Sequence, residues 1–129
     1  MVVDTSALIA ILADEPERRP FIDAIEAAGI RLISAATFVE ASIVLETRHG
    51  ADGSRLFDLF LDRAGIDIVD VDAEQAREAR RGFARFGKGR HPAGLNFGDC
   101  FAYALSLTSG EPLLFKGNDF SQTDVEAVA

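Results

Sequence analysis

The sequence predicts an α/β fold in which helices cover both faces of a central parallel sheet of four or five strands. Short apolar runs alternate with helical stretches along the whole chain, and no repeat, low-complexity tract or linker interrupts that alternation. A chain of 129 residues that is 48% hydrophobic is long enough for one core and short for two. We therefore expect a single domain over residues 1–129.

The first third of the chain predicts two strands and two helices. The apolar run at residues 1–3 is typical of a buried strand, and residues 6–12 are typical of a short helix. Residues 16–28 predict a second helix, which Gly29 closes because glycine is favoured just past a helix C-terminus. The second strand is expected over residues 31–34.

The middle third predicts a helical hairpin and a third strand. Apolar side chains at helical spacing indicate a helix over residues 36–49 that ends at Gly50. The same spacing indicates a partner helix over residues 54–64. The apolar run at residues 66–71 predicts the third strand.

Two further helices follow. Asp72 is a suitable N-cap for a helix over residues 73–86, because its side chain can accept from the free N–H groups of the first turn. A loop rich in Gly, Lys, Arg, His and Pro follows over residues 87–94. Asn96 can cap the next helix in the same way, over residues 97–108.

The chain closes with one or two strands. Residues 112–115 predict the fourth strand, and residues 124–129 can add a fifth at the edge of the sheet. Because helices separate the strands along the chain, the strands are expected to be parallel.

The charge distribution is acidic overall and basic in one segment. With 21 Asp and Glu against 13 Lys and Arg, the net charge of -8 argues against a protein that coats nucleic acid by bulk electrostatics. Between residues 73 and 91, however, six basic residues outnumber two glutamates: Arg77, Arg80, Arg81, Arg85, Lys88 and Arg90. Such a strip can bind a polyanion, although a solvated surface is its commoner use.

The cysteine and histidine content excludes several classes of protein. Cys100 is the only cysteine, so no internal disulfide can form, and two histidines are too few for a histidine-rich metal site. The chain opens with an apolar strand rather than a basic leader, and no apolar run approaches the ~18 residues of a membrane span. We expect a cytoplasmic protein that does not enter a membrane.

Four acidic side chains lie where a carboxylate contributes little to folding. Asp4 directly follows the first strand, Asp99 lies in the first turn of a helix, and Asp119 follows the last main strand. Glu40 is part of an apolar stretch with no Lys or Arg within seven residues. A partly buried carboxylate without a partner costs roughly several kcal/mol unless it is protonated or bound to a cation. Because the carboxyl ends of parallel strands form one crevice, we expect these acids to meet there.

Each acid also has a purely structural interpretation. Asp4 can cap the helix that follows it, although the two hydroxyl residues after it can do so as well. Asp99 is favoured in a first turn by the helix dipole. Asp119 lies in an ordinary turn sequence, and Asp124 competes with it for the same role in a site.

These acids lie in segments that resemble the PIN-domain ribonucleases, most closely the VapC toxins of bacterial toxin–antitoxin pairs. Residues 1–8 match the opening "VDTSAL", residues 96–100 match "N[FY]GDC", residues 113–120 read "LLFKGNDF", and Glu40 occupies the helical acid position. The resemblance implies a three-layer α/β/α PIN-like domain. Many PIN domains carry a further acid where this chain has Gly117, so Asp119 and Asp124 both remain open as the residue that completes the site.

A site of this composition favours a hard divalent ion. Carboxylates, with the hydroxyls of Thr5 and Ser6 and the amide of Asn96 nearby, suit Mg²⁺ or Mn²⁺ rather than zinc. Asp4 and Asp99 are the expected metal ligands. Such an ion lowers the pKa of a bound water and stabilises the leaving oxygen of a phosphodiester. The expected activity is therefore metal-dependent hydrolysis of RNA, and the resemblance further implies 5′-phosphate and 3′-hydroxyl products.

The remaining residues of the expected site have less specific roles. Glu40 is expected to bind the metal or to orient the attacking water, and Asp119 to support the first ion or to bind a second. Arg85, Lys88 and Arg90 are expected to contact the phosphates of the RNA, the alternative being a solvated helix and loop.

The resemblance also implies partners. VapC toxins are typically homodimers held by helices, and a VapB-type antitoxin inhibits them by wrapping an apolar groove and inserting an arginine among the carboxylates. The helix over residues 54–64 is more apolar than one buried face needs, because of Leu56, Phe57, Leu59, Phe60 and Leu61. That surplus serves either a partner or packing within the domain.

Two other classes of protein share part of this pattern. A phosphatase of the haloacid dehalogenase type also opens with a strand followed by Asp, and Lys116, Asp119 and Asp124 resemble the end of its site. Its mechanism needs an acid two residues after the first Asp, where this chain has Ser6. The other class is a catalytically inert binding module of the same fold.

Overall fold

A parallel sheet of four short strands lies at the centre of the computed structural model, which describes residues 1–129. The strands are β1 Val2–Val3, β2 Leu32–Ser34, β3 Asp67–Val69 and β4 Leu113–Leu114. They are ordered β3-β2-β1-β4, and each falls inside its predicted run. The prediction of a fifth strand over residues 124–129 is wrong. That segment pairs with β4 through one bridge, from Leu113 to Ala127, because only Leu113 exchanges hydrogen bonds with it.

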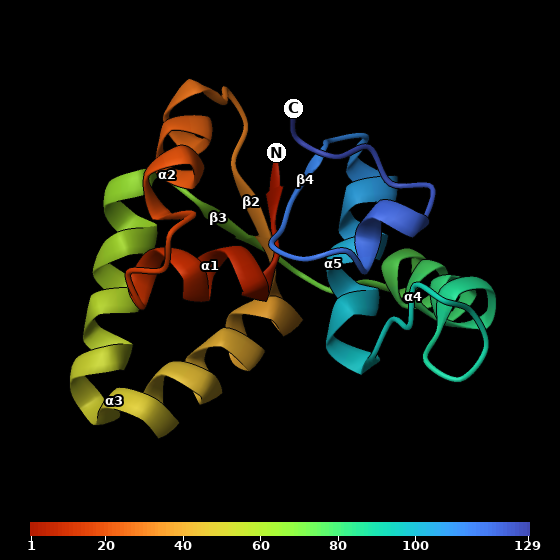
Figure 1. Cartoon of the computed structure of the whole chain (residues 1–129), viewed down its shortest axis with the longest axis horizontal. Coiled ribbons are helices and arrows are strands. Elements are labelled where there is room, and N and C mark those ends of the chain that lie inside the picture. The colour runs from red at the N-terminus through yellow and green to blue at the C-terminus, as the bar shows by residue number, and fades with distance from the viewer.

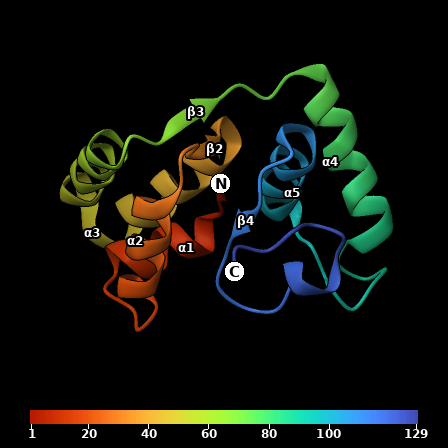
Figure 2. The same ribbon diagram turned by 90° about the horizontal axis from the view of Figure 1, so that it is seen from above.

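Five helices cover the sheet on both faces. They are α1 Thr5–Leu12, α2 Arg18–Ala27, α3 Ala35–Ala64, α4 Ala73–Phe86 and α5 Phe97–Ser109. Figures 1 and 2 show α1, α2 and α3 on one side of the sheet and α4 and α5 on the other. The predicted three-layer α/β/α arrangement is therefore confirmed. None of these helices combines the length and the apolarity needed to cross a membrane.

Neighbouring residues of each strand contribute to two separate cores. Val3, Ile33 and Leu114 are buried in the core beneath α1, α2 and α3. Val2 and Leu113 are buried in the core beneath α4 and α5. The division follows from the alternation of side chains along a strand. A sheet buried on both faces holds the ends of its strands in fixed positions, from which the chain can project functional groups.

A break at Gly50 divides α3 into two arms, residues 35–49 and 51–64. Gly50 has φ +64° and ψ −151°, a backbone conformation that is essentially restricted to glycine. The two arms pack against each other, and the ring centroids of Phe38 and Phe57 lie 5.5 Å apart. The predicted helix end at Gly50 therefore marks a corner, with the hairpin partner following almost at once.

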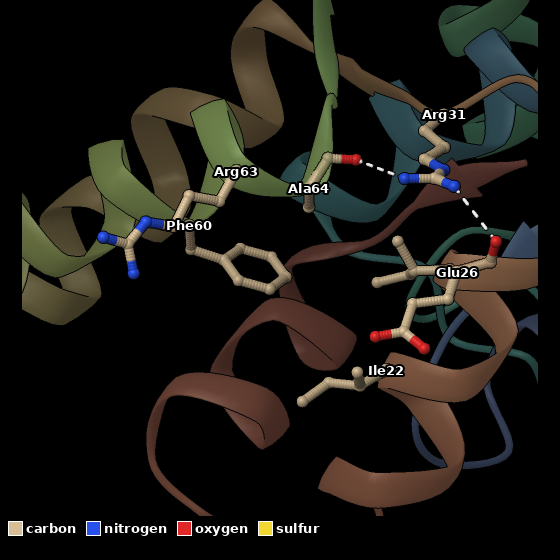
Figure 3. A pocket seen from close by; sticks show the side chains of 7 residues that line it. Ile22, Glu26, Arg31, Phe60, Arg63 and Ala64 are labelled. Carbon is tan, nitrogen blue, oxygen red and sulfur yellow. Dashed lines mark hydrogen bonds between the residues drawn. The ribbon is translucent and has the colours of Figure 1, made fainter.

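Arg31 fixes the end of α2 against the end of α3. Its guanidinium donates to the carbonyl oxygens of Ala28 at 3.0 Å, Glu26 at 3.0 Å and Ala64 at 2.7 Å. Figure 3 shows the bonds to Glu26 and Ala64. The carbonyl groups at helix C-termini carry partial negative charge, so a cation there stabilises both helices. The cleft beside Arg31, of about 220 Å³, is lined by none of the four predicted site acids.

Candidate active site

Asp4 is held at the carboxyl end of β1, where α1 begins. Its carboxylate accepts from the backbone N–H of Ser6 at 3.0 Å and from the Ser6 hydroxyl at 2.6 Å. The Ser6 hydroxyl in turn accepts from the N–H of Lys116, just after β4, at 3.0 Å. Asp4 therefore caps α1, as its structural interpretation requires, but it is also 3% exposed and has no cation beside it. Asp4 is therefore compatible with both interpretations, a cap for α1 and a ligand for a cation.

Glu40 reaches the same place from the first arm of α3. The Thr5 hydroxyl donates to Glu40 Oε1 at 2.6 Å, which joins this carboxylate to the start of α1. On its other side the carboxylate lies against Gly98, at the start of α5. Glu40 forms no ion pair, so the absence of nearby basic residues in the sequence is matched in the folded chain.

Asp99 completes the capping arrangement of α5. The Asp99 N–H donates to Asn96 Oδ1 at 2.9 Å, and the Asn96 N–H donates to Asp99 Oδ2 at 3.0 Å. This reciprocal pair satisfies two backbone N–H groups at the helix start and fixes the direction of the carboxylate. The expected site residue Asn96 thus acts on Asp99 rather than projecting its amide freely into the crevice.

The electrostatics show that the four acids share one region. The pKa of Asp99 is raised to about 6: burial is the largest cause, the bond with Asn96 opposes it, and the negative charges of Asp4, Asp119 and Glu40 add to it. Burial also raises the pKa of Asp4, with Glu40 adding to the effect and the bonds from Ser6 opposing it. None of the eight ion pairs of the chain includes any of the four acids. The crevice therefore concentrates negative charge without a counter-charge of its own.

The donor atoms of this crevice fit a hard divalent cation. They are carboxylate and hydroxyl oxygens, with no thiolate or imidazole among them, which favours Mg²⁺ or Mn²⁺ over zinc. In the present side-chain arrangement no three His, Cys, Asp or Glu residues form a ready-made metal cage. Thr5 holds one oxygen of Glu40, and Asn96 holds one oxygen of Asp99. Each carboxylate keeps a second oxygen free of those bonds.

Asp119 and Asp124, the two alternatives for the last acid, lie in different surroundings. Asp119 is exposed on the loop after β4, just before a short 3₁₀ turn, Phe120–Gln122, and its charge acts on Asp99. Asp124 instead accepts from the Tyr103 hydroxyl at 2.8 Å and pairs with Arg85 at 3.2 Å. The geometry thus favours Asp119 as the fourth acid of the crevice.

The basic residues expected to contact RNA also differ from one another. Arg85 is engaged with Asp124, and its guanidinium lies over the ring of Phe86. Arg90 lies over the ring of Phe83, 5.4 Å from its centroid, and has no acidic partner. Lys88 is exposed and forms no ion pair.

Comparison with known proteins supports a single family. The PIN domain family matches residues 1–126 of the chain. Ribonuclease VapC30 of Mycobacterium tuberculosis is 54% identical over 129 residues, which is 100% of this chain and 98% of that protein. The chain belongs to the PIN-domain family, among the VapC ribonucleases.

Solved structures of VapC proteins share the fold. M. tuberculosis VapC20, a toxin that cleaves the sarcin–ricin loop, aligns with a TM-score of 0.77 at 17% identity and covers 96% of this chain and 95% of its own. A toxin–antitoxin complex from Klebsiella pneumoniae aligns with a TM-score of 0.71 at 18% identity, covering 95% and 92%. These similarities concern the fold alone, and they confirm the predicted PIN-like architecture.

Membership of the VapC ribonucleases confirms the predicted class of enzyme. The chain is an endoribonuclease toxin of a toxin–antitoxin system. The arrangement of Lys116 also disagrees with the phosphatase alternative, because its ammonium group pairs with Glu15 at 3.0 Å and Glu17 at 3.3 Å and not with the crevice.

Sequence reasoning missed one participant in this VapC-type site. The motif at residues 96–100 includes Gly98 but gives no reason for a glycine there. In the structure a Cβ atom at this position would lie 1.9 Å from Glu40 Oε2. A glycine in the first turn of a helix, directly before the candidate site residue Asp99, is the signal that could have identified it.

Proposed function

We propose that this VapC-type protein, acting as one domain over residues 1–129 in the cytoplasm, hydrolyses RNA with Mg²⁺ bound by Asp4 and Asp99. The observation that carries the proposal is the gathering of four carboxylates with no basic side chain to neutralise them. Crowded, partly buried carboxylates without a partner are costly, and a divalent cation removes that cost. Mn²⁺ satisfies the same oxygen donors and substitutes for Mg²⁺.

Some of the site residues bind the metal ion, and Glu40 transfers a proton. Ser6 holds Asp4, and Asn96 holds Asp99, so both ligands are oriented before a cation arrives. The bound metal lowers the pKa of water and stabilises the leaving oxygen of the phosphodiester. Glu40 Oε2 accepts no hydrogen bond, because Thr5 binds Oε1, and this second oxygen would accept a proton from the attacking water. Asp119, on its exposed loop, supports the first ion or binds a second.

The RNA backbone approaches along the loop that follows α4. Lys88 and Arg90 carry uncompensated positive charge there, and phosphate contacts of this kind position a nucleic acid without specifying its sequence. Arg85 is a weaker candidate than its neighbours, since its pairing with Asp124 would have to be exchanged for a phosphate. The rest of the chain is acidic and repels phosphate groups, so contact with RNA is confined to this basic segment.

A VapB-type antitoxin and a second copy of the chain are the expected protein partners. The K. pneumoniae structure contains a toxin with its antitoxin. In this chain an apolar groove of about 370 Å³ begins at Glu40 and Gly98, and its lining includes the exposed side chains of Val39, Ile43 and Phe97. A basic side chain of an antitoxin seated in this groove would reach the uncompensated carboxylates, so we assign the groove to the antitoxin.

The second arm of α3 supplies an additional apolar surface. Phe57 and Leu61 are buried within the domain, whereas Leu56 is 58% and Leu59 43% exposed. The surplus apolar residues predicted over this helix therefore serve both uses, domain packing and a surface for a second copy. Analytical ultracentrifugation of the chain alone tests this assignment. A mass twice the 13.9 kDa of the chain supports the dimer, and a mass of 13.9 kDa contradicts it.

The activity is tested on two substrates under two conditions. Purified protein is incubated with total RNA and with a generic phosphate monoester, in the presence of Mg²⁺ and of a chelator. Cleavage of RNA with Mg²⁺ alone supports the proposal, and mapping of the new 5′ ends identifies the target. RNA cleavage that persists in chelator contradicts the metal-dependent mechanism, and hydrolysis of the monoester in place of RNA contradicts the substrate.

A further inference from the structure

Gly98, near the start of α5, lies directly against the Glu40 carboxylate. A Cβ atom built on Gly98 would lie 1.9 Å from Oε2, 2.5 Å from Cδ and 2.7 Å from Oε1 of Glu40. All three distances are far below van der Waals contact, so any side chain at this position and the present Glu40 carboxylate exclude each other.

The local backbone gives no other reason for a glycine here. Gly98 is the second residue of α5 and is absent from the residues with positive φ, so an L-residue fits its conformation. Alanine is favoured over glycine within a helix because it loses less backbone entropy. The missing side chain therefore matters for what lies opposite, which is Glu40.

Glu40 is held in that space from both sides. The Thr5 hydroxyl binds Oε1 at 2.6 Å, from the start of α1, while the backbone of Gly98 faces Oε2 from the start of α5. A carboxylate at the end of a flexible side chain can swing out toward solvent at little cost to the fold. The same movement would remove it from Asp4 and Asp99, at a large cost to the site.

We propose that Gly98 is a positioning residue: its missing side chain leaves the space in which the Glu40 carboxylate faces Asp4 and Asp99. This inference deepens the proposed function and rests on it. Gly98 touches neither the substrate nor a metal, and it acts only through Glu40. The helix start that carries Asp99 thereby also sets the position of the acid from α3.

The test is Gly98→Ala, examined by three measurements. RNA cleavage is expected to lose about 100-fold in kcat with little change in KM, because misplacing a catalytic group by about an ångström has an effect of that size. The affinity for Mn²⁺, measured by electron paramagnetic resonance without RNA, is expected to weaken by about tenfold. The Tm is expected to stay the same or rise, because the helix gains an alanine.

Two other glycines provide matched controls. A Cβ at Gly82 would lie 2.6 Å from the buried ring of Tyr103, so Gly82→Ala is expected to lower the Tm. A Cβ at Gly29 would meet nothing within 4 Å, so Gly29→Ala is expected to leave Tm, Mn²⁺ affinity and cleavage unchanged. The Gly98 variant should resemble neither: it loses metal affinity and rate while keeping its stability.

A double-mutant cycle with Glu40→Ala shows whether Gly98 acts through Glu40. In the Glu40→Ala background, Gly98→Ala is expected to change Mn²⁺ affinity less than about twofold, because the group it displaces is already gone. Wild-type affinity and rate in Gly98→Ala, or an equal loss with and without Glu40, overturns the inference alone. Wild-type protein that binds no Mn²⁺ and cleaves no RNA overturns the proposed function, and this inference with it.

Discussion

Asp124 and the two crevice acids Asp4 and Asp99 have opposite electrostatic surroundings. Asp124 follows the 3₁₀ turn and is matched by Arg85 at 3.2 Å and by the Tyr103 hydroxyl at 2.8 Å. Asp4 and Asp99 lie in the crevice with other carboxylates, and neither takes part in an ion pair.

The difference separates acids that stabilise the fold from acids that await an external cation. At Asp124 the fold supplies a positively charged partner, the guanidinium of Arg85. In the crevice the hydrogen bonds to Asp4 and Asp99 come from neutral groups, which orient the carboxylates without neutralising them. Asp4 and Asp99 thus support the starts of α1 and α5 and still carry a charge that no basic side chain neutralises.

The largest effect is expected when one crevice acid loses its charge. Asp4→Asn or Asp99→Asn should reduce Mg²⁺-dependent cleavage by about 10³-fold, since a bound metal contributes several kcal/mol to transition-state stabilisation. Asparagine is as good an N-cap as aspartate, so Asp4→Asn should keep the start of α1 intact. Initial rates on RNA and thermal melts followed by circular dichroism measure both consequences. Cleavage within about tenfold of the wild type would contradict the metal-ligand roles.

A smaller effect is expected from the basic loop. Replacing Lys88 and Arg90 by Ala should weaken RNA binding by about tenfold and reduce the slope of log affinity against log salt by about 1.4, which is 0.7 for each lost phosphate contact to a single strand. Adding Arg85→Ala should change the slope less than either of the other two, because Arg85 is already paired with Asp124. Fluorescence anisotropy of a labelled RNA across a salt series measures these slopes. Unchanged slopes would show that RNA approaches by another route.

The crowded crevice should also make the stability of metal-free protein depend on pH. The pKa of Asp99 rises from 3.8 in the unfolded chain to about 6 in the fold, so the folded state holds the extra proton between these values. The resulting stabilisation is complete below pH 4 and is lost as the pH rises through 6. Because Asp99 is partly solvent-screened, we expect a loss of about 1–2 kcal/mol rather than the full value of the shift.

Chemical denaturation in the presence of a chelator at pH 4 and pH 7 tests this dependence. Asp99→Asn should lose about 1–2 kcal/mol less than the wild type over that range, because the amide does not titrate. At pH 7, Mg²⁺ should stabilise the wild type by binding the folded state, and should stabilise the variant less. Equal pH dependence in the two proteins would show that the pKa of Asp99 is not raised in the folded state.

The smallest effect is expected at Asp124, whose charge is paired with Arg85. Asp124→Asn removes the charge opposite Arg85 but leaves an oxygen for the Tyr103 hydroxyl, so the free energy of unfolding should fall by about 0.5–1 kcal/mol, as is typical of exposed ion pairs. RNA cleavage should stay within about twofold of the wild type. A loss of cleavage comparable to that of Asp99→Asn would place Asp124 in the site and remove the distinction between the two groups.

Most of the fold was predictable because it depends on short-range patterns. Asp72 and Asn96 were expected as N-caps and both cap their helices, and Gly50 was expected at a helix end and forms the corner of α3. Cap and glycine preferences are local properties of the backbone, so they can be seen in one sequence. The strand over residues 124–129 failed because only Leu113 of β4 exchanges hydrogen bonds with that segment, and no local pattern shows how far such pairing extends.

The candidate acids could be proposed from the sequence, whereas their contacts could not. Asp4 and Asp99 stood out by their positions at a strand end and a helix start, and Glu40 because no basic residue lies within seven positions of it. The choice between Asp119 and Asp124 depended on Tyr103 and Arg85, which are 21 and 39 residues from Asp124, and no local pattern contains that information. Gly98 was missed for the same reason, since its role exists only against a side chain from another helix.

Crystals of the protein soaked in Mn²⁺ test the central claim most directly, through the anomalous difference map. The account predicts a peak in the crevice, with oxygens of Asp4 and Asp99 about 2.1 Å away, and no peak beside Asp124. A fully soaked crystal with no peak between Asp4 and Asp99, or with a basic side chain occupying that space, would contradict it.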